Sequence, residues 1–283
     1  MHLWEALVLG LVQGLTEFLP ISSSAHLRIL GEALPSAADP GAAFTAIIQI
    51  GTELAVLVYF RREVWAILKS WTISAVRWSR PRDQDAKLGW LIILGSAPIV
   101  LLGFCFQDAI ETRLRNLYIT GAMLIVFGLL LGAADMYAGR AGRHRAPKTI
   151  DDLGARDGLW YGLAQALALI PGVSRSGGTI TAGLALRYSR EAAARYSFLL
   201  AMPAVFGAGI LELVNALGEK TELGAGWGAT IAAALVAFCV GYLVIIAFLK
   251  IVSTYSYKPF VYYRIGLGAL VIALVAGGVL YPV

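Results

Sequence analysis

Six long stretches of this 283-residue chain are almost free of charged side chains, and they constrain the fold more than any other feature. Each is about long enough to cross a hydrocarbon core of ~30 Å as a helix. Glu53 and Glu212 are the only formal charges within them. The sequence therefore predicts an all-α integral membrane protein with six transmembrane spans, at residues 42–60, 88–106, 117–134, 197–217, 223–249 and 265–283.

Two further apolar stretches are too short or too polar to cross alone. Residues 3–19 and 159–173 each run into a cluster of proline, glycine and serine, where a helix should break. We expect the segments 3–30 and 159–186 to be re-entrant helical hairpins, which leave the membrane on the side where they entered. Broken backbone at that depth is tolerated only when it is buried in protein or lines a wet cavity.

The basic residues predict how the spans are oriented. Most of the 23 lysines and arginines fall in connections that would share one face of the membrane, and by the positive-inside rule that face is cytoplasmic. Topology therefore accounts for nearly all of the net charge of +5, so nucleic acid is not an expected partner. The connections counted on this face are residues 61–87, residues 135–157, the stretch from Arg187 to Arg195, and the stretch that holds Lys250, Lys258 and Arg264.

An internal repeat relates the two halves of the chain. The segments LVQGLTEFLPISSS (residues 11–24) and LAQALALIPGVSRS (residues 163–176) align without a gap, so that Ser22 pairs with Ser174. A re-entrant hairpin does not cross the membrane, so each half crosses it three times. An odd number of crossings inverts the second copy relative to the first. We predict a single membrane domain of two inverted-topology repeats, at about 1–135 and about 158–283, joined by a cytoplasmic linker at about 136–157.

The first hairpin would place a carboxylate within the membrane, where such residues usually face a cavity and have a partner. Gln13 and Glu17 are four residues apart, so they share a face of a helix. Glu17 could ligate a hard divalent cation through oxygen or act as a general base. Gln49 and Glu53 repeat the same spacing in the first span; they either hydrogen-bond the hairpin or extend its polar cavity.

Ser22, Ser23, Ser24 and His26 follow in the same hairpin. A hydroxyl beside an imidazole can act as a nucleophile, with the imidazole as general acid and base. Three consecutive serines also make an ordinary helix cap, so catalysis and capping both stay open on chemistry alone.

The second hairpin predicts an anion site. In PGVSRSGGT (residues 171–179), proline and glycine break the first half-helix, and a following helix would point its positive end at a ligand. Ser174, Ser176 and Thr179 offer hydroxyl donors, and the planar fork of Arg175 suits phosphate oxygens. The Gly-Lys-Ser/Thr ending of a P-loop is absent from this segment.

The segments QGLTEFLPISSSAHL and PGVSRSGGT, with IIQIGTELAVLVYF between them, resemble the bacterial undecaprenyl-diphosphate phosphatase family of the bacitracin-resistance type, and the similarity runs the full length. Some members have glutamate where this chain has Gln13, and the substitution weakens the case for a two-carboxylate metal site. The signature positions of that family are matched here by Gln13, Glu17, Pro20, Ser22, Ser23, His26, Pro171, Gly172, Ser174, Arg175, Ser176 and Thr179.

The resemblance implies removal of the terminal phosphate from the C55 polyprenyl diphosphate carrier. The product, the monophosphate, would re-enter cell-wall synthesis, and the activity would confer bacitracin resistance. A divalent cation, Mg²⁺ or Ca²⁺, is implied as cofactor. The implied location is the bacterial inner membrane, with an active site that opens to the periplasm. The lipid substrate and the bilayer are the expected partners, and a homodimer is an open assembly state.

We hypothesise that residues of both hairpins share the chemistry. Two routes stay open: Ser23 attacks the terminal phosphorus while His26 carries the proton, or water attacks with Glu17 or His26 as base. A rival class is a lipid transporter or flippase, because inverted repeats with broken helices are typical of carriers. In either route, Glu17 and Gln13 would ligate the cation and the diphosphate would be held by Ser22, Ser174, Arg175, Ser176 and Thr179.

Overall fold

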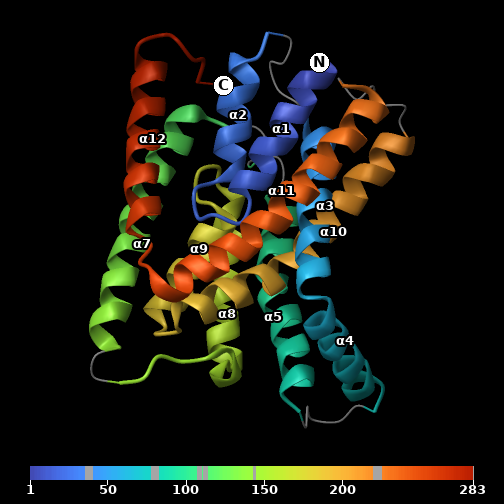
Figure 1. The fold of residues 1–283 in the computed structure, drawn as a ribbon, viewed down its shortest axis with the longest axis vertical. Helices are drawn as coiled ribbons and strands as arrows, with labels where there is room; N and C mark the ends of the chain where they lie inside the picture. Colours follow the sequence, from blue (N-terminus) through green and yellow to red (C-terminus); the bar gives the residue numbers. More distant parts are fainter. Residues whose placement is uncertain are drawn as a thin grey trace.

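The computed structural model describes residues 1–35, 41–77, 83–106, 110, 114–142, 145–218 and 225–282, and all of its regular elements are helices (Figure 1). Short 3₁₀ turns, η1 (Ile150–Asp152) and η2 (Leu167–Leu169), lie on either side of α8. The α-helices are α1 (Leu3–Thr16), α2 (Ser23–Ala33), α3 (Ala42–Tyr59), α4 (Arg61–Val76), α5 (Gln84–Cys105), α7 (Leu117–Ala141), α8 (Ala155–Ala166), α9 (Arg175–Ala185), α10 (Arg190–Gly218), α11 (Gly226–Thr254) and α12 (Lys258–Ala276).

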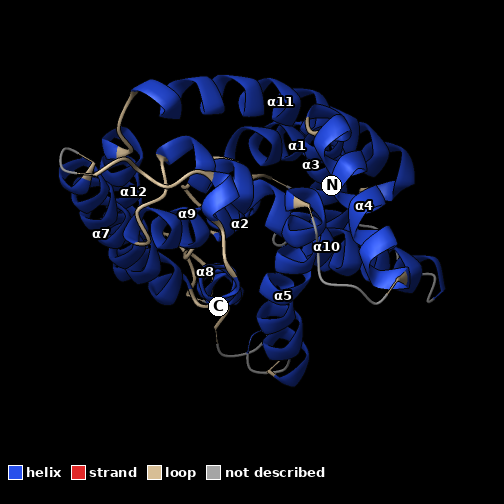
Figure 2. Ribbon diagram, turned by 90° about the horizontal axis from the view of Figure 1, so that it is seen from below, coloured by secondary structure: helices blue, strands red, loops and turns tan. Residues whose placement is uncertain are grey.

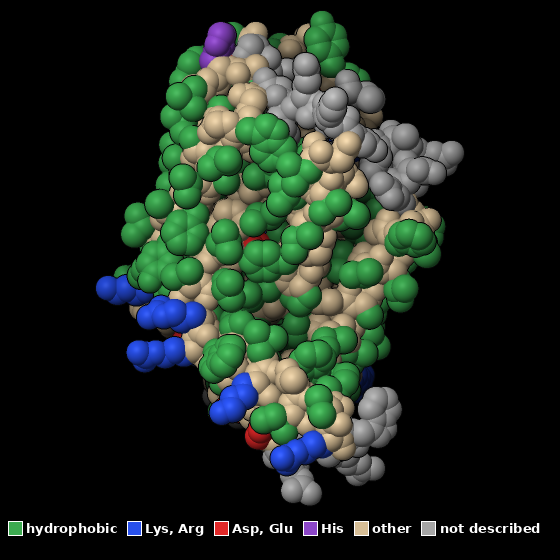
Figure 3. Space-filling model, turned by 90° about the vertical axis from the view of Figure 1, so that its right-hand side faces the viewer, with side chains coloured by type: hydrophobic (Ala, Val, Ile, Leu, Met, Phe, Trp, Pro, Cys, Tyr) green, Lys and Arg blue, Asp and Glu red, His purple; other side chains and the backbone are tan. Residues whose placement is uncertain are grey.

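Among the described residues, five helices are long and apolar enough to cross a membrane: α5, α7, α10, α11 and α12. The helices α3 and α4 qualify together but are bent by 84° at their junction, which raises the number to six if the pair is one span. The chain is therefore a multi-pass membrane protein. Figure 3 shows one face on which hydrophobic side chains cover the middle, and Lys and Arg gather toward the lower end.

The last predicted span was placed too late in the sequence. The apolar stretch at 265–283 led to a helix start at Ile265, but α12 begins at Lys258 and ends at Ala276. A proline at the first turn and a mostly apolar, aromatic run after it favour this earlier start. Arg264 consequently lies inside α12, and its assignment to the cytoplasmic connection was wrong.

Both predicted hairpins are broken helices. The first consists of α1 and α2, and the second of α8, η2 and α9. Ser22 precedes α2 with φ of 72°, and Ser174 precedes α9 with φ of 69°, so both breaks use a left-handed residue at the same repeat position. Figure 2 shows α2 and α9 in the interior, between α7 and α12 on one side and α3 and α10 on the other.

Each hairpin packs closely on one long helix. The helix α1 lies against α11, where a Cβ added to Gly10 would meet the carbonyl oxygen of Ala233 at 2.3 Å. The helix α8 lies against α5, where a Cβ at Gly162 would meet the carbonyl oxygen of Gly95 at 2.5 Å. Only glycine allows backbones this close, so the two positions permit the tight packing of each hairpin on its long helix.

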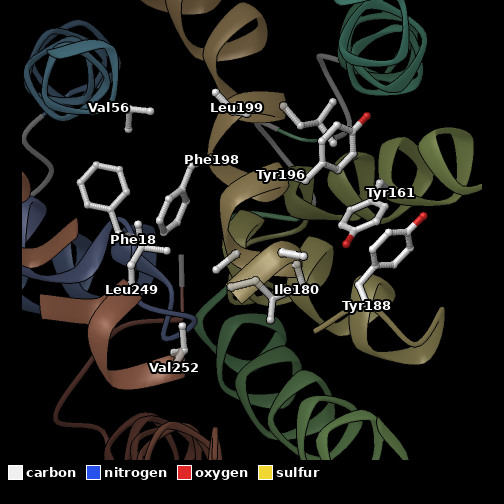
Figure 4. Packing of buried hydrophobic residues seen from close by; sticks show 14 of the residues in the cluster. Phe18, Val56, Tyr161, Ile180, Tyr188, Tyr196, Phe198, Leu199, Leu249 and Val252 are labelled. Carbon is white, nitrogen blue, oxygen red and sulfur yellow. The ribbon is translucent and has the colours of Figure 1, made fainter. Parts of the chain in front are cut away.

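A buried aromatic cluster anchors the hairpins to α10 (Figure 4). Phe18, at the tip of the first hairpin, packs edge-on against Phe198 of α10 with ring centroids 5.3 Å apart. Tyr161 of α8 packs edge-on against Tyr196 of α10 at 4.8 Å. Burying a Phe side chain stabilises a fold by about 1.5–3 kcal/mol, so these contacts hold both hairpins against the same helix.

The two ends of the second hairpin are joined at its base. The Tyr188 hydroxyl, just after α9, donates to the Asp157 carboxylate at the start of α8 at 2.6 Å. Lys148 donates to the same carboxylate oxygen at 2.8 Å. Burial, the hydrogen bond to Asp157 and the charge of that carboxylate raise the pKa of Tyr188 well above its ordinary value, so the phenol stays a donor.

Candidate active site

Glu17 is the centre of the first hairpin tip. It lies at the C-terminal end of α1, where the side-chain amide of Gln13 donates to its Oε2 at 2.8 Å. The chain then turns back, so that the hydroxyl of Ser23, the first residue of α2, donates to the same oxygen at 2.6 Å. The predicted shared face of Gln13 and Glu17 is confirmed, and the helix break adds Ser23 to it.

The second tip presents Arg175 at the start of α9. Ser174 caps this helix, because its hydroxyl oxygen accepts from the backbone amide of Gly177 at 3.1 Å. Gly172 has φ of +93°, and a Cβ there would lie 2.3 Å from the carbonyl oxygen of Thr120, so only glycine fits this turn. The backbone amides at the N-terminal end of α9 and the guanidinium of Arg175 therefore lie at the same tip.

The structure brings the two tips together. Nη2 of Arg175 donates to Oε1 of Glu17 and, at 3.2 Å, to Oε1 of Glu53. The Ser176 hydroxyl donates to the carbonyl oxygen of Leu19 at 3.0 Å. The two broken hairpins of the sequence, far apart along the chain, thus meet through an ion pair and a hydrogen bond.

Glu53 comes from α3 and joins the ion pair rather than the first hairpin. Its carboxylate contacts Arg175, whereas its neighbour Thr52 lies 3.5 Å from the side-chain amide of Gln13. Gln49 enters the network through its carbonyl oxygen, which accepts from the Thr52 hydroxyl at 2.8 Å. The sequence left two alternatives for Gln49 and Glu53: a hydrogen bond to the first hairpin, or an extension of its polar site. Glu53 fits the second alternative, because it contacts Arg175. The residue that hydrogen-bonds the hairpin is Thr52, which accepts from Gln13.

Two carboxylates thus contact one guanidinium, and the exposed area of all three side chains is small. The exposed fractions of the side chains are 5% for Glu17, 1% for Glu53 and 17% for Arg175. Charges buried this deeply are costly unless they are paired and hydrogen-bonded, and removing one partner leaves another uncompensated. In membrane proteins such clusters usually mark a functional site.

His26 does not contact the Ser23 hydroxyl in this structure. Its Nδ1 lies 2.7 Å from the carbonyl oxygen of Ser22, and its Nε2 lies 2.7 Å from the hydroxyl of Tyr263 on α12. The two rings stack with centroids 5.6 Å apart. The proton-carrying role of His26 therefore stays a prediction, and the observed partner of the Ser23 hydroxyl is Glu17.

The remaining predicted phosphate ligands divide into two groups. Ser174 and Ser176 lie at the second tip with their hydroxyl oxygens 3.2 Å apart, and Ser22 lies at the first tip beside Ser24 at 3.1 Å. Thr179 is fully buried and points to α10, where its hydroxyl lies 2.5 Å from that of Ser197. The structure therefore does not bring the Thr179 side chain to the Glu17–Arg175 ion pair.

Arg264 is the main residue that sequence reasoning missed. It is fully buried in α12, and its guanidinium donates to carbonyl oxygens of both hairpin tips, including those of Pro20 at 3.0 Å and Gly172 at 2.8 Å. The signal available in the sequence was its setting, because the residues from Val261 to Tyr263 before it are apolar or aromatic and favour a helix interior.

The site offers oxygen atoms that suit a divalent cation. Oε1 of Gln13 and Oε2 of Glu53 are buried and have no hydrogen-bond partner among the described residues, and Glu17 lies between them in the network. Within the described residues, no group of three or more His, Cys, Asp or Glu side chains is placed to hold a metal. Two carboxylates with an amide oxygen are nevertheless the hard donors that Mg²⁺ and Ca²⁺ prefer, so the residues fit such an ion.

The comparisons with known proteins bear on the whole chain. Residues 6–270 match the family described as bacitracin resistance protein BacA. This chain belongs to that family. It is 61% identical to Undecaprenyl-diphosphatase 2 of Agrobacterium fabrum over 276 residues, which cover 98% of this chain and 96% of the relative. It is 58% identical to Undecaprenyl-diphosphatase of Bifidobacterium animalis subsp. lactis over 292 residues, covering 100% and 97% of the two chains.

Proposed function

We propose that this chain is an undecaprenyl-diphosphatase, which removes the terminal phosphate of undecaprenyl diphosphate and leaves the monophosphate. The membership of the bacitracin-resistance family supports this activity and the resistance that goes with it. The observation that carries the chemistry is that Arg175, which suits an anion, and the hydroxyl of Ser23 both donate to one buried carboxylate, that of Glu17. The regenerated monophosphate would serve again as the lipid carrier of cell-wall synthesis.

In this proposal the diphosphate is held by the second tip. The fork of Arg175 and the hydroxyls of Ser174 and Ser176 face the first tip at the positive end of α9, which favours phosphate oxygens. In this structure Arg175 is held by two carboxylates. A phosphate that takes over Arg175 leaves Glu17 free to accept a proton, so substrate binding and activation of the base are coupled.

Glu17 then acts as the base for Ser23, because it is the acceptor of the Ser23 hydroxyl at 2.6 Å. The Ser23 oxygen bonds to the terminal phosphorus as the bond from that phosphorus to the bridging oxygen breaks. The Ser23 proton moves to Glu17 and then to the departing monophosphate. Water next bonds to the phosphorus of phosphoserine, gives a proton to Glu17, and that proton returns to Ser23 as inorganic phosphate leaves.

A trapping experiment separates this route from direct attack by water. Purified protein is mixed with undecaprenyl diphosphate labelled in its terminal phosphate, quenched in acid within one turnover, and digested. The serine route predicts labelled Ser23 peptide that is absent from Ser23→Ala. Label release at the normal rate by Ser23→Ala would contradict it and favour water, with Glu17 or His26 as base.

A divalent cation is proposed as cofactor, held by Glu17, Glu53 and the amide oxygen of Gln13. When bound, Mg²⁺ or Ca²⁺ would neutralise charge that develops on the transferring phosphoryl group. Chelation should abolish phosphate release, and adding back Mg²⁺ or Ca²⁺ should restore it. Full activity after exhaustive chelation would remove the cation from the proposal.

We also propose the inverted-repeat architecture, with repeats at about 1–135 and about 158–283 and a linker at about 136–157. Three matched features support it: the left-handed turns at Ser22 and Ser174, the close approaches at Gly10 and Gly162, and the reciprocal packing of α1 on α11 and of α8 on α5. In the repeat, α5 and α11 occupy equivalent places, so each hairpin packs on the other half.

Orientation in the bacterial inner membrane follows from this architecture. Both termini lie at the same end of the molecule (Figure 1), and the basic connections at the other end would face the cytoplasm. The first hairpin would then enter from the periplasm and open the site to that side. Single cysteines at Trp4 and Tyr137, both exposed, should react with an impermeant thiol reagent in intact cells at Trp4 alone, once the native cysteines are replaced.

The decisive test of function is phosphate release from undecaprenyl diphosphate by the purified protein. Release that disappears in Glu17→Ala and Arg175→Ala supports the enzyme, and release that survives both points to a contaminating phosphatase. Lipid translocation without release would instead support a carrier, which the repeat architecture also suits. A homodimer stays a prediction, which light scattering of the solubilised protein tests.

A further inference from the structure

Arg264 is a fully buried cation whose acceptors in the described part of the chain are all neutral carbonyl oxygens. The two carboxylates of the candidate site, Glu17 and Glu53, form ion pairs with Arg175. A buried guanidinium is tolerated when its donors are satisfied, and membrane proteins commonly use backbone carbonyls for this purpose. The number and placement of these carbonyls therefore matter more than ion pairing.

The acceptors belong to three separate parts of the fold. One guanidinium nitrogen donates to the carbonyl of Pro20, in the first tip. The other terminal nitrogen donates to Gly172 at 2.8 Å and Val173 at 2.9 Å, in the second tip. The Nε atom donates to Leu124 of α7 at 3.2 Å. A single rigid side chain thus joins both broken helices to α7 and α12.

Those carbonyls flank the reacting groups. Pro20 is three residues before Ser23, and Val173 is two residues before Arg175. The guanidinium packs closely against the first turn of α9, since a Cβ added to Gly177 would lie 2.5 Å from Nη1 of Arg264. A shift of the guanidinium would therefore move the backbone that carries Ser23 and Arg175.

We propose that Arg264 is a positioning residue, which sets the separation between the Ser23–Glu17 tip and the Arg175 tip. The inference rests on the proposed diphosphatase activity. Lysine cannot replace it fully, because one ammonium group lacks the planar fork that reaches Pro20 and Gly172 from two nitrogens. The substrate would still bind at the second tip, but the attacking oxygen would be misplaced.

Kinetics of phosphate release form the first test. Arg264→Met should lower kcat about 100-fold with little change in KM, as expected when a reacting group is misplaced by about 1 Å. Arg264→Lys should recover part of this loss. Lys258→Met, which removes an exposed cation from the first turn of α12, is the matched control and should act like the wild type. Wild-type kinetics in Arg264→Met would overturn the inference.

A distance measurement tells positioning from general destabilisation. Nitroxide labels are placed at Leu15 and Leu167, exposed residues at matching places in the two hairpins, after the free Cys105 and Cys239 are replaced. Pulsed EPR of the monodisperse fraction should give a narrow distance distribution in the wild type and Lys258→Met, and a broader one in Arg264→Met. An unchanged distribution in Arg264→Met would overturn the positioning role.

The two tests also separate this inference from the proposed function. If the wild type releases no phosphate, the proposed function fails, while the EPR comparison still decides whether Arg264 holds the tips. If the wild type is active and Arg264→Met matches it in rate and distance distribution, the inference alone fails.

Discussion

The two hairpin tips have nearly the same backbone and opposite chemistry. Ser22 and Ser174 have φ of 72° and 69°, and each starts a short helix. The next residue is Ser23 in the first tip and Arg175 in the second, so the proposed nucleophile and the anion ligand occupy the same position of the repeat. In the proposed inverted repeat, equivalent backbone breaks place two helix ends at one point, and the different side chains at matching positions make that point an asymmetric site.

The difference extends to how the tips are supported. Ser174 caps its helix by accepting from the Gly177 amide, whereas the Ser22 side chain makes no capping bond. The first tip is held instead by the hydrogen bond from Gln13 to Glu17, and the position of Glu17 is occupied in the second tip by Leu169. One tip is thus built around a carboxylate and the other around a helix N-terminus, which suits a base and an anion site respectively.

The largest expected effect is that of Glu17→Gln. The change removes the acceptor of the Ser23 proton and a partner of Arg175, so phosphate release should fall by about 10²–10⁴-fold. The matched control is Glu212→Gln, an acid on α10 outside the site, which should stay near wild type. An equal loss in both variants would contradict the role of Glu17 as the carboxylate around which the first tip is built.

Arg175→Lys should come next, with a loss of about 10²–10³-fold. Lysine keeps the charge but loses the fork that contacts Glu17 and would contact two phosphate oxygens. Steady-state kinetics should show that KM rises, because in the proposed mechanism the second tip binds the substrate. A turnover close to wild type would remove the bidentate role from the second tip.

His26 should matter less than Glu17. It supports the first tip through Ser22 and Tyr263, so His26→Asn and Tyr263→Phe should each lower activity about fivefold, the equivalent of one neutral hydrogen bond of about 1 kcal/mol. Parallel rate measurements check this. A loss for His26→Asn as large as that for Glu17→Gln would make His26 the proton carrier.

The smallest expected effect is a difference in stability between alanine variants of the two left-handed serines, Ser22 and Ser174. Ser22→Ala and Ser174→Ala place the same residue at the same left-handed position, but only the second removes a helix cap. Ser174→Ala should therefore be less stable by about 1 kcal/mol, seen as a lower unfolding midpoint in detergent. Equal midpoints would show that the cap does not contribute.

The sequence predicted the parts of this comparison that are local. Helical spacing placed Gln13 and Glu17 on one face, and the proline and glycine of each signature marked the breaks that became the tips. The expected inverted repeat also predicted that the two tips face each other, because broken helices of inverted halves commonly meet near the midplane; the pairing of Arg175 with Glu17 is what the structure adds. These predictions needed only periodicity and symmetry.

Long-range partners could not be predicted in the same way. Arg264 was counted with the cytoplasmic basic residues because apolar length alone started the last span after it, and nothing local shows that Pro20 and Gly172 are its acceptors. The motif predicts Thr179 as one of the hydroxyl donors to phosphate, yet its hydroxyl lies against that of Ser197 on α10. In both cases a helix from another part of the chain decided the direction of the side chain.

The most direct test of the shared site is a double-mutant cycle on phosphate release with Glu17→Gln, Arg175→Lys and the combined variant. Residues that act as one unit show strongly non-additive losses. Because Glu17 and Arg175 join the two tips, the combined variant should be no more than a few-fold slower than the worse single variant. Losses that multiply across the two substitutions would mean that the tips work independently, and would contradict a single site built from both hairpins.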